Sequence, residues 1–107
     1  MDATEKTLSR VAEILKSVAN PIRLKILCLL ATQKSVSVNV IADAMGCEQS
    51  LTSHHLNNLR SKGVVVMSRK GKHVYYALKN PQIIGIVKCI IKCEASVCKS
   101  CLLYTSP

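Results

Sequence analysis

The sequence changes its hydrophobic period at Gly63, and this change constrains the fold more than any other feature. Before Gly63, residues 49–60 carry apolar side chains at the three- and four-residue spacing of a helix. After it, residues 64–68 and 74–78 are rich in β-branched, aromatic and apolar side chains, which is typical of strands. Gly71 lies between these two segments and can adopt the positive φ of a tight turn. The sequence therefore predicts a helix followed directly by a β-hairpin.

A second helix precedes this one at a short separation. Residues 38–45 have apolar side chains at helical spacing, with Ser35 or Ser37 suited to cap the start. Gly46 is suited to end the helix in a tight turn. Two helices joined through a glycine and a few further residues have the spacing of a helix-turn-helix motif.

Three further helices complete the predicted fold. Residues 8–18 have amphipathic spacing with Thr4 as N-cap, and residues 22–31 are apolar almost all round, as expected of a central core helix. An Asn-Pro pair opens the last helix, over residues 82–93. Residues 94–107 form a tail with no clear period.

Length and composition fit one globular domain. The chain has 107 residues, of which 49% are hydrophobic and 20% charged, and this balance argues against disorder. The longest apolar run, residues 26–31, is far shorter than the roughly 18 residues of a membrane helix, and charges interrupt the N-terminus where a signal peptide would be apolar. We predict a cytoplasmic protein without a membrane partner. Its single domain, residues 1–107, is mainly α with a small β-hairpin: a winged helix-turn-helix in the order α-α-α-α-β-β-α.

The charge distribution points to a polyanionic partner. Fifteen Lys and Arg against six Asp and Glu give a net charge of +9. Residues 49–93 contain no acidic residue, but they contain Arg60, Lys62, Arg69, Lys70, Lys72, Lys79, Lys88 and Lys92. A field of one sign attracts polyanions, and DNA releases counterions when its phosphates are neutralised. The alternative is a basic surface that serves only solubility.

The helix over residues 49–60 has a small polar face opposite its leucines. Gln and Asn side chains can read adenine edges, and Ser or Thr can serve either type of base pair. Cations at the hairpin tip would contact phosphates or the minor groove. The predicted DNA contacts are Gln49, Ser50, Thr52, Ser53, His54 and Asn57 on the helix, and Arg69, Lys70 and Lys72 on the hairpin. His55 is predicted at the edge of the core. In the alternative interpretation the motif serves packing alone, which leaves the polar face unexplained.

Three stretches resemble the ArsR/SmtB family of bacterial and archaeal repressors. They are residues 15–27 (LKSVANPIRLKIL), 49–60 (QSLTSHHLNNLR) and 69–78 (RKGKHVYYAL). The resemblance implies a homodimeric repressor, with its first and last helices at the dimer interface and an effector that releases double-stranded DNA. Two-fold symmetry predicts an inverted-repeat operator with half-sites roughly 34 Å apart. We expect a regulator and not an enzyme.

The known effector sites of this family can be compared with the chain. The arsenic site needs cysteines in the third helix, and residues 37–42 have none. The zinc site needs Asp and His at the start of the last helix, where Asn80 and Gln82 are poor ligands. The pair Cys28 and Cys93 resembles the two-cysteine arrangement of the family's thiol-sensing branch. In that branch one thiolate attacks an oxidant or persulfide, and the second then closes a disulfide or polysulfide bridge. Cys28 could instead be a small buried hydrophobe.

A second interpretation uses four thiols near the C-terminus. Cys89 and Cys93 share a helix face, and Cys98 and Cys101 have a common ligand spacing. Together they would suit zinc, cadmium or lead, and three of them would suit arsenite. The thiol switch requires no cofactor, whereas this alternative binds a soft metal ion or metalloid. Cys47, beside the turn, is a minor candidate ligand.

Two further classes are less consistent with the sequence. A metal-carrier protein would use the same C-terminal thiols without any effect on DNA affinity. A thiol oxidoreductase would need a Cys-x-x-Cys pair at a helix N-terminus in an α/β setting, and the pair at residues 98–101 lies in the tail.

Overall fold

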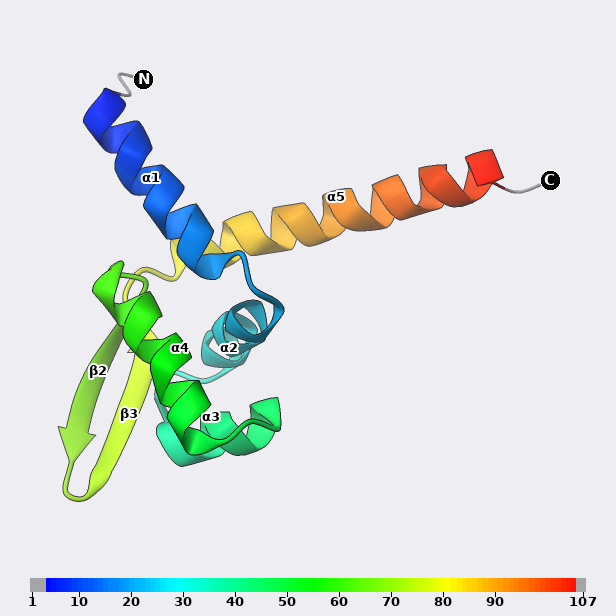
Figure 1. Cartoon of the computed structure of the whole chain (residues 1–107). Coiled ribbons are helices and arrows are strands. Elements are labelled where there is room, and N and C mark those ends of the chain that lie inside the picture. Colours follow the sequence, from blue (N-terminus) through cyan, green and yellow to red (C-terminus); the bar gives the residue numbers. More distant parts are fainter. Residues whose placement is uncertain (1–3, 106–107) are drawn as a thin grey trace.

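The computed structural model describes the backbone of residues 4–105 and the side chains of residues 4–94. The elements are α1 (Glu5–Val18), α2 (Pro21–Thr32), β1 (Val36–Ser37), α3 (Val38–Met45), α4 (Gln49–Ser61), β2 (Val65–Lys70), β3 (His73–Leu78) and α5 (Gln82–Thr105). The predicted mainly α winged helix-turn-helix is confirmed, with one added strand. Figure 1 shows α4 beside the β2–β3 hairpin, with α1 and α5 on the opposite side of α2 from α3.

Local side-chain hydrogen bonds cap the first turns of α1, α2 and α3. The hydroxyl of Thr4 accepts from the Thr7 amide and caps α1. Asn20 caps α2 by accepting two backbone amides, and Pro21 follows in the first turn, where no amide is needed. Ser37 caps α3, and Gly46 ends it at φ 65°, in the left-handed region that favours glycine. The caps at Thr4 and Ser37 and the end at Gly46 match the sequence prediction, with Ser37 chosen over Ser35, whereas the cap at Asn20 was not predicted.

The sheet has three antiparallel strands in the order β1-β3-β2. The hairpin pairs Val65 with Leu78 and Lys70 with His73, so both strands are longer than predicted. Gly71 turns the chain at φ 63°. The strand β1, which the sequence did not predict, pairs its two residues with Tyr75 and Tyr76 of β3.

The core lies where α2, α3 and α4 meet the sheet. Ile26 and Leu27 of α2 are completely buried, as predicted for the central helix. The buried apolar cluster consists of Val18, Ile26, Leu27, Leu30, Val36, Ile41, Leu56, Leu59, Val64, Val65 and Tyr76. Every element from α1 to β3 contributes to this cluster, so α4 is anchored from behind.

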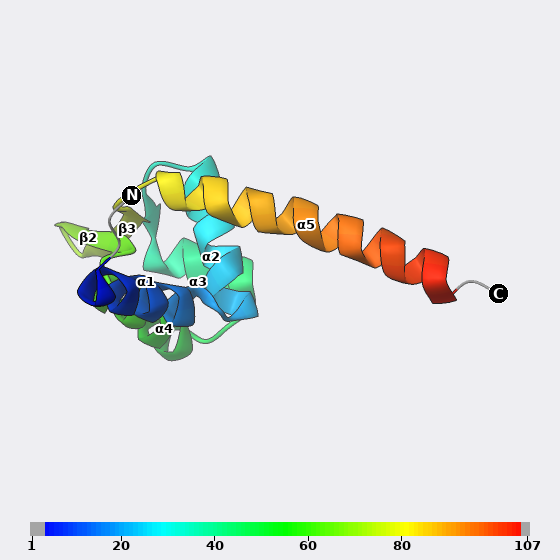
Figure 2. The same ribbon diagram turned by 90° about the horizontal axis from the view of Figure 1, so that it is seen from above.

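The last helix runs beyond its predicted end. α5 continues from Gln82 to Thr105, so the predicted end of the last helix near Cys93 is wrong. The physical reason is that no glycine or proline interrupts residues 86–105. Figures 1 and 2 both show α5 leaving the rest of the domain as a long single helix. None of the described helices is long and apolar enough to cross a membrane.

Candidate nucleic-acid interface

Helix α4 packs with one face against the core. Thr52, His55, Leu56 and Leu59 are its buried residues, at the spacing of one helix face. The prediction that His55 lies at the core edge is confirmed, since it is 7% exposed. The prediction that Thr52 contacts DNA is wrong, because its side chain is 0% exposed and lies in the same row as Leu56 and Leu59.

The opposite face of α4 is open. Gln49, Ser50, His54 and Asn57 are exposed, and Ser53 is half-buried. These five side chains are short or of medium length, and each can donate or accept hydrogen bonds. Figure 1 places the N-terminal half of α4 and the hairpin tip on the side of the molecule away from α1 and α5.

The hairpin tip carries the three predicted cations. Arg69 and Lys70 end β2, Lys72 lies in the turn, and all three are exposed. The Lys70 Nζ lies 5.9 Å from the centre of the Tyr75 ring, on the neighbouring strand. This cation–π contact orients one of the tip charges while leaving it open to solvent.

A concave surface of about 430 Å³ joins α4 to the hairpin. It is lined by Gln49, Ser53, Asn57 and Arg60 of α4, by Met67, Arg69, Val74 and Tyr76 of the hairpin, and by Val38. The sequence prediction missed Arg60, whose Nη1 lies 3.2 Å from the Met67 Sδ. Arg60 could have been found from its spacing, since it follows Ser53 and Asn57 at i+7 and i+3 on the same helix face. A concave surface lined by two arginines and by amide and hydroxyl side chains suits a DNA strand.

A part-buried polar network contacts α4 on the side that faces the core. The Arg23 guanidinium on α2 donates from Nε to His55 Nδ1 (3.0 Å), and from Nη1 to Asn58 Oδ1 (2.9 Å) and the Ser17 carbonyl (3.0 Å). Burial lowers the pKa of His55, and the charges of Arg23 and His54 lower it further. A neutral imidazole is what this geometry requires, because only an unprotonated Nδ1 can accept from Arg23.

A surface ion pair ties the far end of α4 to α1. Lys62, which follows α4, donates from Nζ to Glu13 Oε2 at 3.1 Å. The hydrogen bond and charge of Lys62 lower the pKa of Glu13, and Lys16 adds to this effect. The pair is exposed, so it orients the two segments more than it stabilises them.

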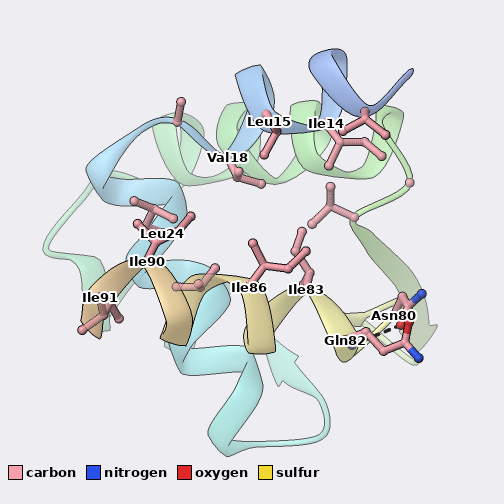
Figure 3. Close-up of a pocket in the computed structure, with 15 residues that line it drawn as sticks. Ile14, Leu15, Val18, Leu24, Asn80, Gln82, Ile83, Ile86, Ile90 and Ile91 are labelled. Carbon is pink, nitrogen blue, oxygen red and sulfur yellow. Dashed lines mark hydrogen bonds between the residues drawn. The ribbon is translucent and has the colours of Figure 1, made fainter. Parts of the chain in front are cut away.

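Helices α1 and α5 leave an apolar cavity of about 620 Å³ between them. Figure 3 shows Ile14, Leu15 and Val18 of α1 pointing toward Ile83 and Ile86 of α5 across this space. Large apolar side chains remain exposed on both helices, including Leu8, Val11, Leu15, Ile86, Ile90 and Ile91. A surface of this kind marks a protein interface.

Four cysteines lie among the described side chains, and all four are free. Cys28, Cys89 and Cys93 are exposed and Cys47 is half-buried. The alternative that Cys28 is a buried hydrophobe is therefore wrong: it occupies the outer side of α2, while Ile26 and Leu27 fill the core. Leu24, one turn before Cys28, lines the same cavity as Ile90, three residues before Cys93.

The proposed four-thiol cluster is only partly described. The side chains of Cys98 and Cys101 lie outside the described residues. Within residues 4–94, no three His, Cys, Asp or Glu side chains are gathered as a metal site.

The chain is similar in sequence and in structure to known transcriptional regulators. Residues 20–66 match the family described as "Bacterial regulatory protein, arsR family". The transcriptional repressor PagR of Bacillus anthracis is 40% identical over 77 residues, which are 72% of this chain and 77% of PagR. Its crystal structure has a TM-score of 0.72 and 37% identity, covering 81% of this chain and 99% of that one.

Two other relatives extend the comparison. A homodimeric winged helix-turn-helix DNA-binding domain from Mycobacterium bovis has a TM-score of 0.76 and 33% identity, covering 86% of this chain and 87% of that one. The transcriptional activator HlyU of Vibrio cholerae is 30% identical over 94 residues, with 86% of each chain covered. The structure of its reduced form has a TM-score of 0.73 and 30% identity, covering 82% of this chain and 92% of that one.

Proposed function

Because this chain belongs to the ArsR family of DNA-binding transcriptional regulators, we propose that it is a homodimeric repressor whose affinity for DNA falls when Cys28 and Cys93 react. The DNA is an inverted-repeat operator, read by Gln49, Ser50, Ser53, His54 and Asn57. Arg69, Lys70 and Lys72 bind its phosphates, and Arg60 joins them. Thr52 is left out of this interface because it is buried.

One observation supports the cysteine switch most directly: both thiols are exposed, and the two helices that hold them are in contact. Cys28 lies on α2 and Cys93 on α5, and these helices touch. Helix α2 also contacts α4, while α5 lines the apolar surface suited to dimerisation together with α1. A covalent link between them would change the position of α5 relative to α4. In a dimer built on α1 and α5, that change alters the spacing of the two α4 helices and so their fit to two half-sites.

The chemistry balances with a hydroperoxide as oxidant. One thiolate attacks the peroxide oxygen and becomes a sulfenic acid, while the alkoxide or hydroxide leaves and takes a proton. The second thiol then attacks that sulfur and expels water, forming the disulfide. Two thiols lose two electrons in total, and the hydroperoxide gains them. A persulfide reacts by the same two displacements, first releasing its thiolate and then hydrosulfide.

The test requires a defined DNA. A duplex is first selected from a randomised library by the reduced wild-type protein, and affinity is then measured by fluorescence anisotropy. Treatment with hydrogen peroxide or inorganic polysulfide should lower the affinity of the wild-type protein by at least about tenfold. Dithiothreitol should restore it. C28S and C93S should bind the duplex normally when reduced and should not respond.

Control variants separate the thiol pair from the soft-metal alternative. C47S should respond like the wild-type protein, because this half-buried thiol is outside the pair. The double variant C98S/C101S should also respond to oxidants. The metal alternative predicts instead that zinc, cadmium or arsenite releases the duplex and that C98S/C101S abolishes this release. An unchanged oxidant response in C28S would overturn the proposed pair.

A further inference from the structure

We infer that Arg23 is a positioning residue for DNA recognition: it fixes the angle of α4 relative to α1 and α2, and thereby sets operator specificity. The inference goes beyond the cysteine switch, since it concerns the reduced protein. It is argued from hydrogen bonds on the inner side of α4, opposite the proposed DNA-reading face.

The first observation is that one side chain joins three helices. Arg23 belongs to α2 and donates to the Ser17 carbonyl at the end of α1. It also donates to His55 and Asn58 on α4, 32 and 35 residues further along the chain. Both protons of Nη1 are used, one for α1 and one for α4. Hydrogen bonds from a charged donor are stronger than neutral ones and strict in direction, so they restrict rotation of α4 as packing of Leu56 and Leu59 alone does not.

The second observation is the place of the contacts along α4. His55 and Asn58 lie on the inner side of the helix, and His54 and Asn57 immediately precede them on the outer side. A rotation of α4 that breaks the bonds to Arg23 therefore moves the reading side chains by a similar amount. Direct readout depends on hydrogen-bond geometry, whereas phosphate contacts from the flexible side chains of the hairpin tolerate such movement. Loss of Arg23 should therefore lower specific binding and spare non-specific binding.

The test compares R23M with K25M under reducing conditions. Both variants remove one cation from α2, but Lys25 is exposed and no hydrogen bond of its side chain joins it to α4 among the described residues. We expect R23M to lower affinity for the selected duplex by about tenfold or more, and for a scrambled duplex by less than about twofold. K25M should keep the wild-type ratio of the two affinities. If R23M leaves the ratio of the two affinities unchanged, whether both affinities stay the same or both fall equally, the inference is overturned.

A second pair of variants keeps the inference testable if R23M does not fold. H55Q retains a neutral acceptor for the Arg23 Nε, and H55L removes it. Because the positive charge of Arg23 faces the imidazole from α2 and His54 adjoins it on α4, protonation of His55 should break the bond. The wild-type specificity ratio should thus fall only as pH approaches the folded-state pKa of His55, which lies below its ordinary value of 6.5, while H55Q keeps its ratio across this range. H55L should have a low ratio at every pH. Equal ratios for H55Q and H55L would show that the bond positions nothing.

Discussion

The Lys62 Nζ lies 3.1 Å from Glu13 Oε2, so an ion pair connects α1 to the residue that follows α4. The Arg23 network makes a second connection between the same two helices, through the Ser17 carbonyl and Asn58. The two connections differ in burial. The ion pair is exposed to solvent and screened by salt, whereas the network is part-buried and uses charged hydrogen bonds.

The difference in burial leads to the first prediction. E13Q removes the ion pair, and we expect no resolvable change in either the thermal midpoint or DNA affinity, because exposed pairs contribute little. Thermal denaturation and anisotropy at low and physiological salt check this. A clear loss of affinity with E13Q would mean that the surface pair, and not only the Arg23 network, positions α4.

Thr52 gives a prediction on stability. Its Oγ1 is buried without a hydrogen-bond partner among the described residues. Thr52→Val keeps the shape and removes the unsatisfied hydroxyl, so it should stabilise the protein by about 1 kcal/mol. DNA affinity should stay the same, because the side chain is fully buried. Urea denaturation measures the gain.

Thr32→Val is the matched control for this experiment. Thr32 is exposed and its hydroxyl donates to the Leu29 carbonyl, so its replacement should bring no gain. Stabilisation by both substitutions would indicate a general preference for valine in these helices. Stabilisation by neither would indicate that the Thr52 hydroxyl finds a partner in solution.

Substitutions on the open face of α4 and at the hairpin tip should change DNA binding in different ways. S53A or H54A should weaken binding of the selected duplex by about 1–3 kcal/mol and leave binding of a scrambled duplex nearly unchanged. S61A is the control, because Ser61 is exposed on the same helix and, among the described residues, its hydroxyl donates to the Asn58 carbonyl of its own helix. R69A and K70A should weaken both duplexes, and each should reduce the salt slope by about one, since each removes one cation from the phosphates. Equal losses on both duplexes with S53A would remove α4 as the reading helix.

Features of the fold that depend on neighbouring residues could be predicted from the sequence. Features that depend on contacts between distant residues could not. The cap at Ser37 and the turn at Gly71 depend on neighbouring residues, so the sequence predicts them well. Strand β1 has two residues and exists through pairing with β3, about 40 residues away, so no local pattern marks it. The bond from Arg23 to His55 spans 32 residues and was missed for the same reason. On α4 the open face was predicted, but Thr52 was assigned to it from its polarity when its spacing places it with Leu56 and Leu59.

The apolar cavity between α1 and α5 predicts how the dimer forms. Ile86 and Ile90 are 55% and 58% exposed in the single chain, and both line this cavity. I90E should place a charge in the interface and yield a monomer, since an unpaired buried charge is costly. Sedimentation velocity measures the state. V66E, at a β2 residue that is 42% exposed and outside the cavity, should stay dimeric. A dimeric I90E would mean that other helices form the interface.

The buried His55 predicts how stability depends on pH. Burial lowers its folded-state pKa below the ordinary value of 6.5, and the charges of Arg23 and His54 act in the same direction. The folded state therefore holds neutral His55, while the unfolded state binds a proton as pH falls through 6.5. The stabilising effect is complete above 6.5 and declines between 6.5 and the lower folded-state pKa, by at most about 1.4 kcal/mol per pH unit. Urea denaturation at a fixed protein concentration, in steps from about pH 8 to about pH 5.5, measures this decline. H55Q should lack the component that begins near 6.5, because glutamine does not titrate. If H55Q and the wild-type protein lose stability in parallel over this range, the dependence arises from other groups and His55 is not held neutral by the fold.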